Sequence, residues 1–188
     1  MNEEKQAIRE RALKFREELQ PHPDLADEAA KNFFQTVSTS PDQKIAVYFP
    51  LGHELDTMPL VEEYWRRGNV CLLPVFGKDD RHMKFAKWEK GTKLFPQTFE
   101  IPMPEHPEFH DPDILVVPVV AFDQKGNRVG FGKGYYDATL KALREKADIL
   151  AVGYAYAEQA VLMKLPTEEH DEKLDMVVTP QRVFDFRP

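Results

Sequence analysis

Three glycines at alternate positions, Gly130, Gly132 and Gly134, stand between a hydrophobic segment and a helical pattern. Because glycine lacks a Cβ, the backbone N–H groups of such a loop can approach a ligand closely. Free N–H groups and the helix dipole converge where a helix begins, so the loop is a candidate anion site. Arg128 and Lys133 add two cations to it. We interpret this stretch as a phosphate-binding loop.

The glycine spacing differs from two common motifs. A dinucleotide-binding fingerprint would need glycine at position 135, where Tyr135 stands. A Walker loop would need Ser or Thr after Lys133, where Gly134 stands. Spacing alone therefore leaves two interpretations open: a phosphate site, or a tight structural connection between a strand and a helix.

Acidic side chains near the loop are candidate metal ligands. Asp137 falls in the first turn of the expected helix, where an acid is also favourable for purely structural reasons. Mg²⁺ takes one or two carboxylates together with phosphate oxygens, and Asp175 is the second carboxylate that we assign to it. His170 and Asp171 resemble a dyad without an evident serine or cysteine partner, so we interpret them as a loop hydrogen bond. The six histidines show no metal-ligand spacing, which argues against zinc.

Alternating helical and strand patterns predict the elements that position this loop. Helices are expected over residues 3–20, 24–37, 57–68, 136–146 and 158–163, and strands over 44–49, 70–75, 82–88, 114–119, 149–154 and 176–179. The proline-rich segment 95–112 is expected to be a long loop. This order predicts an α/β fold: a three-layer α/β/α sandwich with a mostly parallel central sheet and flanking helices. Loops 50–57 and 120–137 follow the carboxyl ends of strands, so they should meet in one cleft.

The first expected helix carries an apolar stripe at helical spacing, formed by Ile8, Ala12, Phe15 and Leu19. The stripe predicts the face that packs on the core. Lys5 and Arg9 are neighbours on another face. Their spacing alone indicates solvated surface charge.

Composition narrows the function classes. The 188 residues, 42% of them hydrophobic, suit a single domain spanning 1–188. One cysteine, Cys71, excludes an internal disulfide and fits a reducing cytoplasm. A net charge of −7 argues against nucleic-acid or membrane-surface partners, and no apolar run approaches the ~20 residues of a membrane span. We expect a cytoplasmic protein and take it to be a monomer.

The string Ala-Phe-Asp-x-x-Gly-x-Arg-x-Gly-x-Gly-x-Gly-Tyr-Tyr-Asp, at 121–137, closely resembles the signature of the 5-formyltetrahydrofolate cyclo-ligases, also called methenyltetrahydrofolate synthetases. At lower specificity the resemblance covers most of the chain. It implies that Lys5 and Arg9 contact ATP phosphates, against the interpretation from spacing. It also implies that Phe49 lines the pterin site and that Glu54 contacts the pterin.

The resemblance implies further roles for the loop. The ATP-binding residues it adds are Arg128, Gly130, Gly132, Lys133, Gly134, Tyr135 and Tyr136, and the loop residues it assigns to the substrate are Phe131, Gly132, Lys133, Gly134 and Tyr135. Arg128 and Lys133 would carry catalysis, and Asp137 and Asp175 would be magnesium ligands. Phe131 stands where some relatives carry a basic residue, which leaves Lys133 more of the phosphate work.

The reaction that the resemblance implies is ATP-dependent. ATP would phosphorylate the formyl oxygen of 5-formyltetrahydrofolate, and N10 would then close the ring to 5,10-methenyltetrahydrofolate. Candidate apolar walls are Phe49, Met83, Phe85, Trp88 and Phe99. Two alternatives remain open: a non-catalytic folate- or nucleotide-binding relative, and an ATP-independent sugar-phosphate isomerase or acyl-CoA transferase that uses Glu54 as base or nucleophile.

Overall fold

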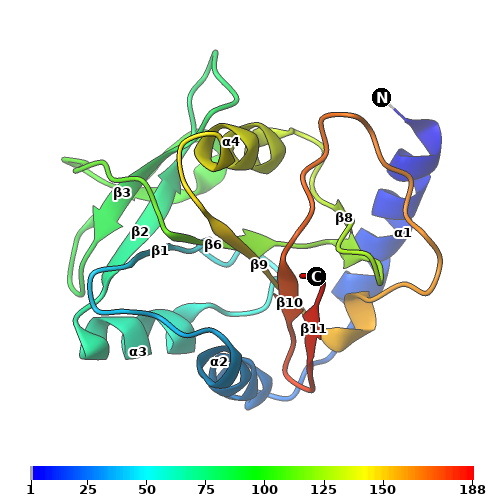
Figure 1. Cartoon of the computed structure of the whole chain (residues 1–188), viewed down its shortest axis with the longest axis horizontal. Coiled ribbons are helices and arrows are strands. Elements are labelled where there is room, and N and C mark those ends of the chain that lie inside the picture. Colours follow the sequence, from blue (N-terminus) through cyan, green and yellow to red (C-terminus); the bar gives the residue numbers. More distant parts are fainter. Residues whose placement is uncertain (1) are drawn as a thin grey trace.

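A seven-stranded sheet forms the centre of the computed structural model, which describes residues 2–188 (Figure 1). Its strand order is β11-β10-β9-β6-β1-β2-β3. The strands are β1 (Lys44–Ala46), β2 (Val70–Val75), β3 (Lys84–Trp88), β6 (Ile114–Pro118), β9 (Leu150–Tyr154), β10 (Met176–Val178) and β11 (Val183–Asp185). The five inner strands run parallel, and the edge strands β3 and β11 are antiparallel to their neighbours. The predicted mostly parallel sheet is confirmed.

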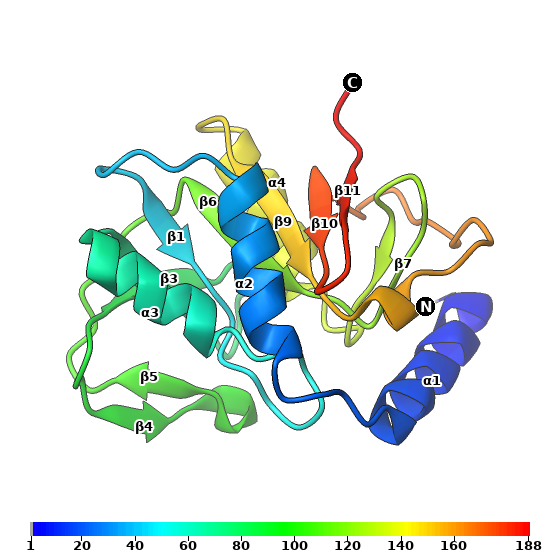
Figure 2. The same cartoon turned by 90° about the horizontal axis from the view of Figure 1, so that it is seen from below.

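Helices cover both faces of this sheet (Figures 1 and 2). The helices are α1 (Glu3–Glu18), α2 (Leu25–Thr36), α3 (Met58–Arg67) and α4 (Tyr135–Arg144). Helices α2 and α3 lie on one face, where Phe33 and Tyr64 pack with Ile45 of β1. Helix α4 lies on the other face, where Leu140 packs in the same cluster as Ala46. Since successive strand residues point to opposite faces, β1 supplies both cores and the three-layer sandwich is confirmed.

The crossover from β1 through α3 to β2 shows how local sequence sets this fold. Gly68 ends α3 in the left-handed region, at φ 83°, which a glycine adopts without a Cβ penalty. Residues 70–75 then form β2 as predicted, with its central four positions buried. Because a parallel strand inside the sheet is covered on both faces, it reads as a continuous apolar run.

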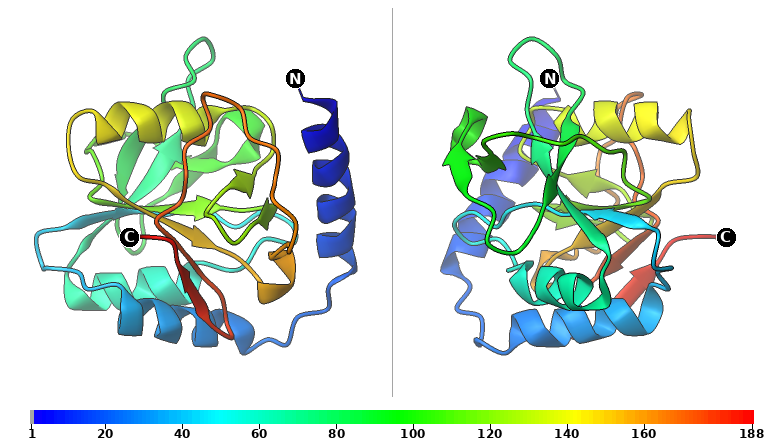
Figure 3. Two further views of the ribbon diagram at one scale, coloured as in Figure 1. Left: turned by 45° about the vertical axis from the view of Figure 1, so that its right-hand side comes forward. Right: turned by 90° about the vertical axis from the view of Figure 1, so that its left-hand side faces the viewer.

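Helix α1 differs from its prediction. Asn2 caps it as expected, since its Oδ1 accepts hydrogen bonds from the N–H groups of Glu4 and Lys5. The predicted core-facing stripe is wrong at Phe15, which is 46% exposed, whereas the buried residues of the helix are Lys5, Arg9 and Arg16. The reason is position: α1 stands beside β8 rather than on a face of the sheet (Figure 3).

Three other predictions need correction. The expected loop 95–112 begins with a hairpin, β4 (Leu94–Pro96) and β5 (Pro102–Pro104), whose turn contains the short 3-10 helix η1 (Thr98–Glu100). Strand β3 begins at Lys84 rather than at residue 82 and is mostly buried. The expected helix 158–163 is only a 3-10 turn, η2 (Ala157–Gln159).

The C-terminal strand β11 was not predicted; it follows a tight turn in which Thr179 accepts from Arg182 N–H through its Oγ1. Across residues 2–188, the helices lack the combination of length and apolar composition needed to cross a bilayer.

Candidate active site

The glycine loop leaves the carboxyl end of β6 through a small hairpin. Strands β7 (Ala121–Phe122) and β8 (Arg128–Val129) form this hairpin, and the Asp123 carboxylate holds its turn. Asp123 accepts hydrogen bonds from the N–H groups of Lys125 and Asn127, and Gly126 adopts the left-handed region at φ 79°. This turn directs residues 130–134 across the end of the sheet into α4.

Two loop glycines lie directly against arginine side chains. A Cβ at Gly132, whose φ is 86°, would stand 3.0 Å from the guanidinium carbon of Arg9. A Cβ at Gly130 would stand 2.6 Å from Nη1 of Arg128. The left-handed φ of Gly132 favours glycine there, whereas a Cβ at Gly130 would meet only the flexible end of the Arg128 side chain. Cationic side chains therefore lie against the loop backbone at both positions.

The buried face of α1 brings its cations to this loop. Arg9 donates through Nε to the Gly130 carbonyl at 2.6 Å, and Lys5 donates through Nζ to Asp171 and, at 3.4 Å, to Glu168. Lys5 and Arg9 are only 7% and 8% exposed. The interpretation of this pair as solvated surface charge is wrong. Arg9 contacts the glycine loop, and Lys5 contacts two acidic residues that line the same cleft.

The other end of the site is acidic and apolar. Glu54, in the loop after β1, accepts a hydrogen bond from the Leu51 N–H at 2.8 Å. Burial raises the pKa of the Glu54 carboxyl, and the Leu51 N–H and the charge of Arg16 only partly offset this effect. Half-buried Phe49 lines the same end of the cleft.

One cleft of about 900 Å³ joins the two ends. Its wall opposite α1 is an aromatic cluster in which the Phe99 and Tyr135 rings lie 5.8 Å apart and Phe76 contacts both. Phe99 stands on the β4–β5 hairpin with a φ of 62°, a conformation that bulky residues rarely adopt and that is common at binding sites.

The structure brings most of the predicted site residues into this cleft. Those that line it are Lys5, Arg9, Phe49, Glu54, Arg128, Gly130, Phe131, Gly132, Lys133, Gly134, Tyr135, Tyr136 and Asp137, together with Phe99. Met83, Phe85 and Trp88 do not line it, because all three are at most 5% exposed and lie in the hydrophobic cores. The prediction that these three form walls of the site is wrong.

The two predicted metal carboxylates are not together. Asp137 lies in the cleft, where its Oδ1 contacts Arg128 Nη2 at 3.1 Å and accepts from the Glu172 N–H at 3.0 Å. Asp175 lies at the opposite end of the sheet, before β10, where its Oδ2 accepts from the Ala151 N–H at 2.7 Å. Asp175 also pairs with Arg144, at 3.1 Å. The assignment of Asp175 to a shared magnesium site therefore needs correction.

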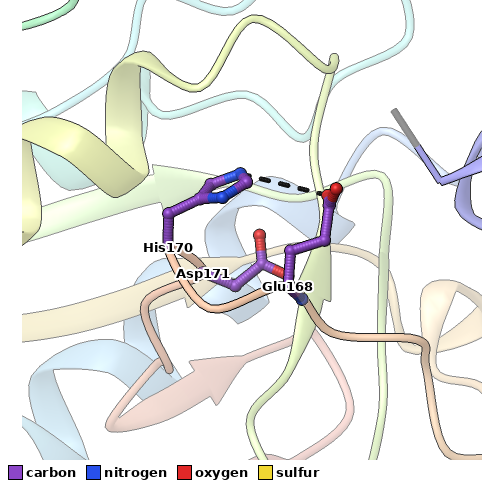
Figure 4. Close-up of side chains that lie close together, drawn as sticks. All are labelled: Glu168, His170 and Asp171. Carbon is purple, nitrogen blue, oxygen red and sulfur yellow. Dashed lines mark hydrogen bonds and ion pairs between the residues drawn. The ribbon is translucent and has the colours of Figure 1, made fainter.

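Asp171 is the carboxylate that sequence reasoning missed. Figure 4 shows it beside Glu168 and His170, and the ligand atoms of these three residues lie within 4.8 Å of one another. His170 points toward Glu168, at 3.9 Å, while Asp171 accepts from the Glu168 N–H and from Lys5, so the expected His170–Asp171 hydrogen bond is not formed. Glu172, the next residue, donates to Asp137, so Asp171 enters the cleft beside Asp137.

Arg16 and Arg81 are further cationic residues of the cleft that were not predicted. Arg81 approaches Gly134 at the start of α4, where its Nη1 would lie 3.4 Å from an added Cβ. Arg16 follows Arg9 by seven residues, or about two helical turns, so its place on the same face could have been read from the spacing.

An α/β/α sandwich with cations, a glycine loop and an apolar, acidic pocket in one cleft is typical of proteins that bind small molecules. Sequence comparison agrees. The sequence model of the 5-formyltetrahydrofolate cyclo-ligase family matches residues 1–180. The 5-formyltetrahydrofolate cyclo-ligase of Escherichia coli K12 is 36% identical over 149 residues, which are 76% of this chain and 80% of the relative. That of Haemophilus influenzae is 36% identical over 138 residues, 70% of this chain and 73% of the relative.

Solved structures give the same result. The 5,10-methenyltetrahydrofolate synthetase of Aquifex aeolicus superposes with a TM-score of 0.81 at 29% identity, covering 98% of this chain and 93% of that one. The synthetase of Mycoplasma pneumoniae, at 22% identity and a TM-score of 0.74 over 94% and 98% of the two chains, shares the fold. The chain belongs to the 5-formyltetrahydrofolate cyclo-ligase family, and it is an enzyme.

Proposed function

We propose that this enzyme converts 5-formyltetrahydrofolate to 5,10-methenyltetrahydrofolate, with ATP as co-substrate and Mg²⁺ as cofactor, and releases ADP and phosphate. The observation that carries the proposal is the single cleft of about 900 Å³, which has a cationic glycine loop at one end and Glu54 with Phe49 at the other. A nucleotide and a folate bound at these two ends would meet at the loop.

The cationic end is the proposed ATP site. Lys133 lines the cleft and is exposed, and residues 2–188 give it no ion-pair partner, so its ammonium is available to a phosphate. Arg128 lies at the same loop, and α4 begins there, so its first N–H groups and its dipole would favour a bound anion. The proposed ATP-binding residues are Lys5, Arg9, Arg128, Gly130, Gly132, Lys133, Gly134, Tyr135 and Tyr136.

The carboxylates at this end suit a magnesium ion. Within residues 2–188, Asp137 makes its hydrogen bond and its ion pair through Oδ1, and Asp171 makes its hydrogen bonds through Oδ2. The second carboxylate oxygen of each residue is therefore free for a cation. Hard carboxylate oxygens beside phosphates are the ligands Mg²⁺ prefers. Asp137 and Asp171, rather than Asp175, would hold the ion, which neutralises phosphate charge when bound.

The acidic and apolar end is the proposed pterin site. The pterin ring presents its 2-amino group and N3–H as neighbouring donors, and a carboxylate such as Glu54 accepts from both. Phe49 lines the same cleft as Glu54, and Phe99 with Tyr135 offers aromatic faces for the aminobenzoyl ring. The proposed substrate-binding residues are Phe49, Glu54, Phe131, Gly132, Lys133, Gly134 and Tyr135.

The chemistry needs positioning and charge more than a protein nucleophile. The formyl oxygen attacks the γ-phosphorus, and the bond between that phosphorus and the ADP oxygen breaks. N10 then attacks the activated formyl carbon, the carbon–oxygen bond breaks, phosphate leaves, and N10 loses its proton. Arg128 and Lys133 are placed to stabilise the charge that develops on the transferred phosphoryl group.

The match to the cyclo-ligase family favours this reaction over that of an isomerase or an acyl-CoA transferase. In addition, neither alternative would use the cationic loop for ATP. We propose that residues 1–188 form a single domain, because residues from its whole length line one cleft, and that the protein is a monomer. We also propose a cytoplasmic location, which suits the free buried thiol of Cys71.

Incubation of the protein with 5-formyltetrahydrofolate and Mg-ATP tests the reaction. The absorbance of the methenyl product should rise, and one ADP should form per methenyl group. Omission of either ATP or Mg²⁺ should abolish the rise. Product formation at full rate without nucleotide would refute the proposed function.

A further inference from the structure

Arg16 is a buried cation with few partners. Its residue is 6% exposed, yet it lines the cleft. Its Nε has no hydrogen-bond partner, and no acidic side chain within residues 2–188 forms an ion pair with it. Its guanidinium carbon lies 5.5 Å from the centre of the Phe131 ring, which covers it from the glycine loop.

The one hydrogen bond that the Arg16 side chain makes within residues 2–188 does not explain its burial. Arg16 donates through Nη1 to the Val119 carbonyl at 3.4 Å, a long contact. The same carbonyl already accepts from Gln159 Nε2 at 2.7 Å. The backbone would therefore remain satisfied without the arginine.

The other two cations on this face of α1 are satisfied differently. Lys5 pairs with Asp171 and Glu168, and Arg9 donates to the Gly130 carbonyl. A buried charge without such partners costs free energy in the unbound protein. Donors kept buried and unpaired at the wall of a cleft indicate a bound ligand as the missing acceptor.

The surroundings of Arg16 identify the part of the substrate that it faces. Arg16 follows Arg9 by about two helical turns toward the Glu54 end of the cleft, and its charge is close enough to lower the pKa of the Glu54 carboxyl. On the edge of the pterin ring, the 4-oxo group follows the 2-amino group and N3–H. If Glu54 accepts from those two donors, the 4-oxo group, which is an acceptor, lies next to Glu54 and requires a donor from the protein.

We propose that Arg16 binds the 4-oxo group of the pterin ring, an inference that rests on the proposed function. Arg16 and Glu54 together then read the full donor–donor–acceptor edge of the pterin. The pairing makes Arg16 a specificity-determining residue. It favours 4-oxo pterins over pterins with a 4-amino group, because the 4-amino group is a donor and would face the donors of the guanidinium without an acceptor between them.

The experiment compares two ligands and three proteins by calorimetry without ATP. The ligands are 5-formyltetrahydrofolate and its analogue with a 4-amino group in place of the 4-oxo group. The proteins are the wild type, Arg16→Met, and the control Arg11→Met, which removes an exposed arginine from the same helix. Arg16→Met should weaken binding of the 4-oxo ligand about 10- to 150-fold and leave binding of the 4-amino analogue nearly unchanged.

Stability provides a second readout. Because Arg16→Met removes an unpaired buried charge, its melting temperature should equal or exceed that of the wild type, and its affinity for ATP should be unchanged. If Arg16→Met fails to fold, Arg16→Lys serves in the same comparison, since it keeps the charge but lacks the Nε donor and the planar fork.

The outcomes separate the two proposals. Equal losses for the two ligands, or no loss for either, would overturn the assignment of Arg16 to the 4-oxo group and leave the proposed function standing. A lower melting temperature with unchanged selectivity would make Arg16 a structural residue. Failure of the wild type to bind 5-formyltetrahydrofolate would overturn the proposed function and the role of Arg16 with it.

Discussion

Replacing Glu54 with glutamine tests the folate end of the cleft alone. Glutamine keeps a carbonyl oxygen that can accept the Leu51 N–H, so the loop after β1 should retain its hydrogen bond. It removes the charge and places an NH₂ group where the pterin presents donors. A hydrogen bond to a charged group contributes about 1.5–3 kcal/mol, so 5-formyltetrahydrofolate should bind about 10- to 150-fold more weakly.

The stability of the variant should not fall. Burial raises the pKa of the Glu54 carboxyl in the folded protein, so the protonated form is favoured on folding. That contribution is present below the ordinary pKa of a glutamate and is lost as the pH rises through the raised pKa. At neutral pH the ionised carboxylate is therefore a cost, and a neutral amide removes it.

The same raised pKa gives a pH dependence for binding. The wild type should lose folate affinity as the pH falls through the pKa of Glu54, above the ordinary range of a glutamate, because the protonated acid no longer accepts from both pterin donors. Glu54→Gln should lack this loss. Calorimetry with folate and ATP separately, with the exposed Glu62→Gln of α3 as control, measures both effects. Unchanged folate affinity in Glu54→Gln would remove Glu54 from the site, and equal losses of folate and ATP would indicate a collapsed cleft.

Two further predictions concern the phosphate end. Lys133→Ala should lose turnover and ATP affinity with little change in melting temperature, because the side chain is exposed and lies between two glycines. A large loss of stability with normal activity would show that the loop has a structural role instead. Asp171→Asn should raise the Mg²⁺ concentration needed for half-maximal activity. Asp175→Asn should lower only stability, since Asp175 binds the Ala151 N–H and Arg144 away from the cleft. Magnesium titrations of both variants would contradict the assignment if Asp175→Asn alone raised the Mg²⁺ requirement.

The sheet was predictable because its strands carry strong local signals. Residues 70–75 form a continuous apolar run, and a parallel strand covered on both faces requires one. The place of the glycine loop between a strand and a helix was also predictable, but its spacing left a phosphate site and a structural connection open. The structure adds a structural reason for two of these glycines, because Arg9 and Arg128 pack against Gly132 and Gly130. The rule that ligands lie beyond the carboxyl ends of parallel strands then placed loops 50–57 and 120–137 in one cleft, as the structure confirms.

The apolar pattern of helix α1 predicted only part of its packing. Ile8 and Ala12 pack against a small hydrophobic cluster, as the pattern predicts, but the most buried side chains of the helix are Lys5, Arg9 and Arg16, which line the candidate cleft. Long basic side chains can cover such a surface with their methylene stems while their charged ends reach polar partners. Phe15 is left exposed as a result.

The choice between Asp171 and Asp175 depends on which end of the sheet each occupies. Asp175 immediately precedes the parallel strand β10, which places it at the amino end of the strands, away from the cleft. Asp171 lies in the irregular segment that returns from the cleft to β10, and sequence patterns do not fix the path of such a segment. The position of Asp175 directly before a strand was the signal that argued against it.

Transfer of the formyl oxygen to phosphate tests the central claim most directly. The enzyme would be supplied with Mg-ATP and with 5-formyltetrahydrofolate that carries ¹⁸O in the formyl group, and the released phosphate would be analysed by mass spectrometry. Because the formyl oxygen attacks the γ-phosphorus and leaves with it, each phosphate should contain one labelled oxygen, and unlabelled substrate in ¹⁸O-water should give none. Label that stays out of phosphate in the first reaction and enters it from water in the second would contradict the account.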